Sequence, residues 1–73
     1  MKNKMYELAK ISKEYKYTKD EFLIIATIAC SSQMYDNGYS SEQAIEKAIE
    51  YIENSKNANE TINKLLTLSG YKD

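Results

Sequence analysis

The sequence predicts an all-α protein, a compact four-helix bundle that forms a single domain over residues 1–73, and three observations support this fold class. The chain contains no proline and only two glycines, so few positions oblige the backbone to leave a helix. Apolar residues recur at helical spacing along most of the chain. Short polar segments interrupt that pattern, which favours antiparallel neighbouring helices. The expected helices span residues 3–16, 19–36, 41–55 and 58–69.

The first expected helix, residues 3–16, is amphipathic and rich in lysine. Met5 and Leu8 lie on its apolar stripe, and most of the lysines lie off it. Residues 1–19 hold six lysines against two glutamates, whereas residues 20–73 hold four lysines against nine acidic residues. This polarity suggests that the basic first helix pairs with the acidic third helix, within one molecule or head to tail between copies; the alternative is two solvated faces that differ in charge.

The second expected helix, residues 19–36, begins at a capping box formed by Thr18 and Glu21. The 14 residues from Phe22 to Tyr35 carry no charge, and their helix is apolar on nearly every side. Either three neighbouring helices surround it or part of its surface meets a second copy, so we expect a homodimer. Cys30 is expected as a small core residue. The expected dimer interface consists of Phe22, Ala26, Ala29, Cys30 and Gln33.

The third expected helix, residues 41–55, has the clearest helical period in the chain. Asn37 and Gly38 end the helix before it. Ser40 or Ser41 is expected to cap its start, with Gln43 near the capping-box position for Ser40. Four glutamates lie beside its apolar face, within about 80° of one another on a helical wheel. We hypothesise that this stripe, flanked by two tyrosines, docks on a basic surface of a larger protein; the alternative is an ordinary solvated face. The predicted partner-binding residues are Glu42, Glu46, Glu50, Glu53, Tyr39 and Tyr51.

The fourth expected helix, residues 58–69, follows a short polar connection. Asn57 or Asn59 is expected to cap its start. Gly70 is expected to end it, because glycine readily takes the left-handed backbone conformation.

The residue content argues against an enzyme and against a bound metal or cofactor. The chain contains no histidine, which is the usual general acid–base near neutral pH. One cysteine without histidine does not supply a zinc site, and no glycine-rich phosphate loop occurs. We therefore assign no catalytic, metal or cofactor residues.

The sequence predicts a cytoplasmic protein that does not enter a membrane. The uncharged run of 14 residues is shorter than the roughly 20 that a transmembrane helix needs, and it contains serine, threonine and glutamine. No apolar segment of the kind found in secretory signals opens the chain. A single cysteine fits a reducing compartment.

The most favoured function is that of a small non-catalytic binding protein, an inhibitor or an adaptor. Compact acidic helical bundles are frequent among inhibitors, immunity proteins and counter-defence proteins of mobile elements, although this is a likeness of architecture alone. The alternative is a small DNA-binding regulator that uses the lysine-rich first helix. Nucleic acid is the less favoured partner, because the glutamates of residues 41–55 would repel phosphates from the candidate recognition helix.

Overall fold

This computed structural model describes residues 3–71 of the chain. Four of its helices have 11 to 14 residues, and a fifth has only five. The predicted all-α four-helix bundle is confirmed, with one of the expected helices divided in two. In chain order the elements are α1 (Lys4–Glu14), α2 (Lys19–Ala29), α3 (Ser32–Asp36), α4 (Ser41–Asn54) and α5 (Ala58–Ser69).

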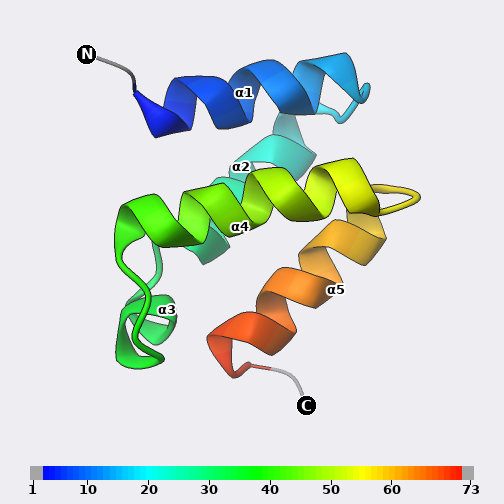
Figure 1. Cartoon of the computed structure of the whole chain (residues 1–73). Coiled ribbons are helices and arrows are strands. Elements are labelled where there is room, and N and C mark those ends of the chain that lie inside the picture. The colour runs from blue at the N-terminus through cyan, green and yellow to red at the C-terminus, as the bar shows by residue number, and fades with distance from the viewer. Residues whose placement is uncertain (1–2, 72–73) are drawn as a thin grey trace.

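The helix α4 crosses the middle of the molecule and contacts α1, α2 and α5 (Figure 1). Helix α2 lies behind α4 in this view and also contacts α1 and α5, while the short α3 packs near the ends of α4 and α5. Every long helix contributes side chains to one core, because each carries apolar residues that must be covered. Leu8, Ile25, Ile52 and Leu65, one from each long helix, are 0% exposed.

The expected helix over residues 19–36 breaks after α2, and this boundary was predicted wrongly. Ser31 has an extended backbone (ψ 156°) and begins α3 as its N-cap. Its hydroxyl donates to the carbonyl of Ile28 at 2.7 Å and accepts from the amide of Met34 at 3.3 Å. The serine side chain thus satisfies backbone groups on both sides of the break. The uncharged stretch therefore forms two helices with separate axes rather than one rod.

The predicted helix starts are confirmed at each capped position. The hydroxyl of Thr18 accepts from the amide of Glu21 at 3.1 Å, and the Glu21 carboxylate accepts from the Thr18 amide at 2.7 Å. Ser40 and Gln43 form the same reciprocal pair at the start of α4. Asn57 caps α5 by accepting from the amide of residue 60 at 3.0 Å. These starts depend on side chains within one turn, which explains why the sequence predicted them.

Three helices end in one shared way. The helices α1, α3 and α5 are each followed by a residue with positive φ, and the next residue is a tyrosine. In each case the tyrosine amide donates to a carbonyl five positions earlier, which is the Schellman motif. The pairs are Lys16–Tyr17, Gly38–Tyr39 and Gly70–Tyr71.

Candidate protein-docking surface

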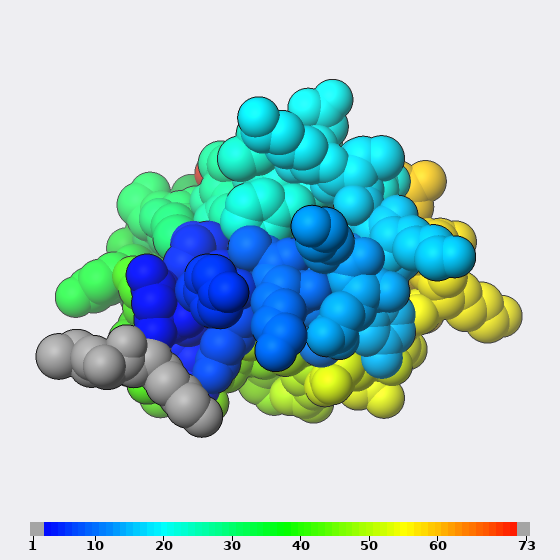
Figure 2. Space-filling view, turned by 90° about the horizontal axis from the view of Figure 1, so that it is seen from above, coloured from blue at the N-terminus to red at the C-terminus, as the bar shows by residue number. Residues whose placement is uncertain are grey.

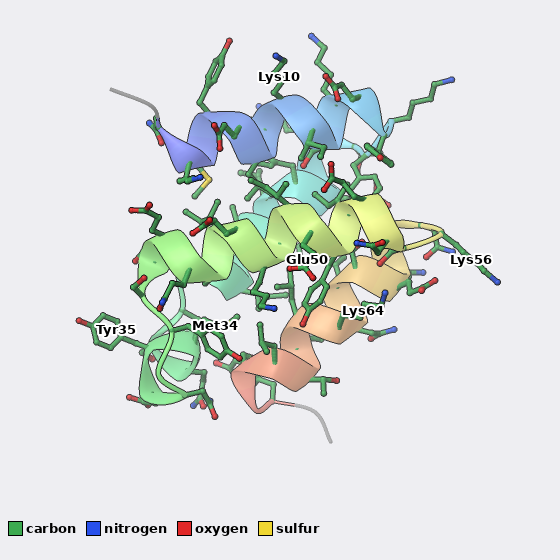
Figure 3. The ribbon with its side chains drawn as sticks, viewed as in Figure 1. Lys10, Met34, Tyr35, Glu50, Lys56 and Lys64 are labelled. Carbon is green, nitrogen blue, oxygen red and sulfur yellow. The ribbon has the colours of Figure 1, made fainter. Side chains whose placement is uncertain are left out.

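The outer face of α4 carries the four predicted glutamates. All four side chains are exposed, because they share one side of the helix while the opposite side packs in the core. The stripe covers about 16 Å of the helix axis at 1.5 Å per residue. Figure 3 shows one member, Glu50, on the front of α4. The stripe consists of Glu42, Glu46, Glu50 and Glu53.

Two lysines of the same molecule partly neutralise this face. Lys4 of α1 lies 3.8 Å from the carboxylate of Glu46, so the expected pairing of the basic first helix with the acidic helix occurs within the molecule. Lys47 lies 3.6 Å from Glu50. Neither Glu42 nor Glu53 forms an ion pair with another described residue. Four carboxylates against two ammonium groups leave the face negative.

A hollow of about 360 Å³, the Tyr39 hollow, adjoins the stripe. Gly38 and Tyr39 form one side of it, and the α4 residues Gln43, Glu46, Lys47 and Glu50 form the other. Tyr39 is half-buried and packs against the core. The structure therefore brings together three of the six predicted partner-binding residues: an aromatic ring and two carboxylates.

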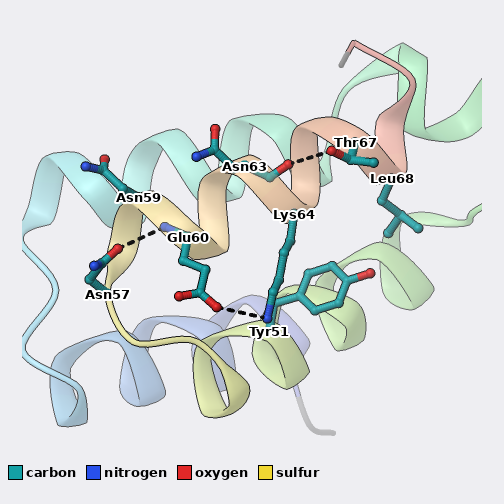
Figure 4. A pocket seen from close by; sticks show the side chains of 8 residues that line it. All are labelled: Tyr51, Asn57, Asn59, Glu60, Asn63, Lys64, Thr67 and Leu68. Carbon is teal, nitrogen blue, oxygen red and sulfur yellow. Dashed lines mark hydrogen bonds and ion pairs between the residues drawn. The ribbon is translucent and has the colours of Figure 1, made fainter. Parts of the chain in front are cut away.

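Tyr51 lies elsewhere. It lines a separate hollow of about 590 Å³ between α4 and α5 (Figure 4). The ammonium of Lys64 lies 5.8 Å from the centre of the Tyr51 ring, within the range of a cation–π contact. Lys64 also pairs with Glu60 at 3.5 Å and donates to the carbonyl of Asn54 at 3.4 Å. Tyr51 is thus engaged with α5 and does not join the Tyr39 hollow.

The expected dimer face is only partly at the surface. Ala29 is 1% exposed and belongs to the core, so it offers almost no surface to a second copy. Phe22 and Ala26 are half-buried and pack against the core. Gln33 is half-buried and belongs to α3 rather than α2. Four of the five expected residues therefore lie on α2 or at its C-cap, and Gln33 lies on a different helix.

The exposed side of α2 differs from the one that the sequence indicated. Leu23 is 47% exposed and Ile24 is 46% exposed, and Thr27 and Cys30 are exposed beside them. Cys30 was expected in the core; it is exposed instead, because it follows α2 at the break where the chain turns away. We call Leu23, Ile24, Thr27 and Cys30 the α2 strip. Cys30 belongs to the expected dimer interface, whereas the other three residues were missed, because a helix with apolar residues on every side has no period that marks its outer face.

A metal site and a membrane-spanning helix set different requirements for the described part of the chain. Residues 3–71 contain no cluster of three or more side chains able to hold a metal ion. None of the described helices is both long and apolar enough to cross a membrane. No protein-family model, curated protein or solved structure matches this chain.

Proposed function

We propose that this chain is a small non-catalytic protein-binding module that docks through the outer face of α4 on a basic surface of a larger protein, as an inhibitor or an adaptor. One observation carries the proposal. Four exposed carboxylates form a continuous stripe on one helix, and only two of them have an ion-pair partner among the described residues.

In the proposed complex, the glutamate stripe would contribute mainly to the association rate and the Tyr39 hollow mainly to the binding energy. Exposed charges steer a partner of opposite charge and raise the association rate more than the affinity. Aromatic side chains near the centre of an interface supply more of the binding energy. Removing the glutamate charges is therefore expected to slow association and weaken its salt dependence, whereas truncating Tyr39 is expected to speed dissociation.

Affinity capture from a lysate of the native host tests the docking face. The immobilised wild-type chain is compared with a variant in which Glu42, Glu46, Glu50 and Glu53 are all changed to glutamine. Glutamine has nearly the helix propensity of glutamate, so the fold should be retained, which thermal unfolding checks. We expect a protein captured by the wild type to be lost by this variant.

A control removes one exposed acidic charge from another helix. The Glu14→Gln variant changes α1, away from the α4 stripe, and should capture the same protein as the wild type. Retention of that protein by the α4 variant would show that the docking face is wrong. An activity assay of the purified captured protein then separates an inhibitor, which lowers its activity, from an adaptor, which does not.

A further inference from the structure

A third hollow, of about 230 Å³, lies between α1 and the start of α2. We call it the α1–α2 hollow. Lys13 and Lys19 line it, together with the half-buried rings of Tyr17 and Phe22. Pockets for whole small ligands usually measure about 300–1,000 Å³, so this hollow suits one flat group rather than an entire small molecule. It combines two positive charges with aromatic surface.

The lysines continue along the outside of α1. Lys10, Lys13, Lys16 and Lys19 are all exposed, and none forms an ion pair with another described residue. Figure 2 looks onto this side of the molecule, with α1 across the face and the first part of α2 beside it. Lys10 points away from the bundle (Figure 3).

An exposed aromatic side chain accompanies these lysines. Tyr6 is 71% exposed and precedes Lys10 by four residues and Lys13 by seven, so the three lie within about 60° on the helix. Glu14 and Asp20 are exposed near them and reduce the net charge without cancelling it. We call Tyr6, Lys10, Lys13, Lys16 and Lys19 the α1 basic face.

We propose that the α1 basic face and the α1–α2 hollow bind single-stranded nucleic acid without sequence preference. Lysine ammonium groups contact phosphates as point charges, and the chain has no arginine, whose rigid planar fork favours two-pronged contacts. Unpaired bases can stack on aromatic rings, which paired bases inside a duplex cannot reach. This inference concerns a different face from α4, so it stands or falls independently of the proposed function.

Fluorescence anisotropy with a labelled oligothymidylate of about 12 nucleotides tests the proposal. If the four lysines neutralise four phosphates of a single strand, the logarithm of the association constant should fall linearly with the logarithm of the salt concentration, with a slope of about −2.8. Each of Lys13→Gln and Lys19→Gln removes one phosphate contact and should make the slope less steep, at about −2.1. The Lys56→Gln variant removes an exposed lysine from the connection between α4 and α5 (Figure 3), outside the α1 basic face, and should leave slope and affinity unchanged.

A second comparison separates base stacking from general attraction to polyanions. Tyr6→Ala removes one aromatic ring on which a base can stack, so it should weaken oligothymidylate binding about fivefold or more. Heparin has no bases, so its binding should be unchanged by this variant. The proposal is overturned if the wild type does not bind the oligonucleotide at low salt, or if Lys56→Gln weakens binding as much as Lys13→Gln. It is also overturned if duplex DNA or anionic vesicles bind more tightly than the single strand.

Discussion

Lys16 is the one residue other than glycine with a positive φ, 63°, in the described part of the chain. The equivalent positions after α3 and α5 are Gly38 and Gly70. A side chain in this left-handed conformation brings its Cβ close to the following carbonyl, at a cost of about 1–2 kcal/mol. The turn between α1 and α2 therefore stores strain that the other two helix ends avoid.

The Lys16→Gly variant is expected to be more stable than the wild type by about 0.5 kcal/mol. Relief of the left-handed strain exceeds the extra chain entropy that glycine adds to the unfolded state. The control Lys13→Gly places glycine inside α1 and should cost about 1 kcal/mol. Urea unfolding followed by circular dichroism measures both variants, and an equal loss of stability in the two would contradict the strain at Lys16.

Tyr17, directly after that turn, ties α1 to α5. Its hydroxyl lies 2.7 Å from the hydroxyl of Thr61, which is 0% exposed. Tyr17→Phe removes this hydrogen bond and is expected to cost about 1 kcal/mol. Tyr6→Phe removes a hydroxyl from the surface and should change stability by less than about 0.5 kcal/mol. Thermal unfolding of both variants measures the difference, and indistinguishable midpoints would show that the pair contributes nothing.

At the scale of an element, a single serine lies at the break between α2 and α3. Ser31 supplies both the cap of α3 and a hydrogen bond back to α2. The break also lets α3 pack against α4 and α5, with Met34 1% exposed. An unbroken helix over residues 19–36 would carry Met34 away along the axis of α2.

The Ser31→Ala variant is expected to lose about 1 kcal/mol of stability, because it removes the N-cap side chain of α3. Ser32→Ala changes the exposed neighbouring serine, which is inside the helix, and should be nearly neutral. Chemical unfolding of both variants gives the comparison. If Ser31→Ala were as stable as the wild type, the break would have to be set by packing of Met34 rather than by the cap.

At the scale of the whole molecule, α2 has helical neighbours on several sides, but part of its apolar surface stays exposed. It contacts α1, α4 and α5, yet Leu23 and Ile24 remain about half exposed. This helix was expected either to have three neighbouring helices or to meet a second copy, and the three neighbours are present. That a second copy covers the rest stays a prediction, now for the α2 strip rather than for a face that includes Ala29.

We expect the wild-type chain to dimerise at micromolar concentration through the α2 strip. The variant Leu23→Gln/Ile24→Gln should sediment as an 8.4 kDa monomer, because it removes the apolar surface that association would bury. Tyr35→Gln, which changes an exposed aromatic on α3, should leave the dimer intact. Sedimentation velocity under reducing conditions excludes a disulfide through the exposed Cys30. A wild-type chain that is monomeric across this range would refute the dimer.

Local chemistry made most of the helix ends predictable. The capping pairs at Thr18 and Ser40 satisfy backbone amides within one turn, so residues a few positions apart suffice to recognise them. The glutamate stripe was equally predictable, because α4 has one clear apolar side and the carboxylates lie off it. The α1–α2 hollow was not predictable, because Lys13 and Lys19 line it from opposite sides of a turn in the sequence, and the course of that turn depends on Lys16 and Tyr17.

The sequence by itself determined the all-α class, the starts of the long helices and the sign of charge on α1 and α4. Only the tertiary structure decided where the uncharged stretch breaks and which sides of α2 stay exposed. The physical reason lies in the stretch itself. A helix with apolar residues on every side has no periodic signal to orient it, so packing against α1, α4 and α5 selects its buried side and leaves Leu23 and Ile24 at the surface.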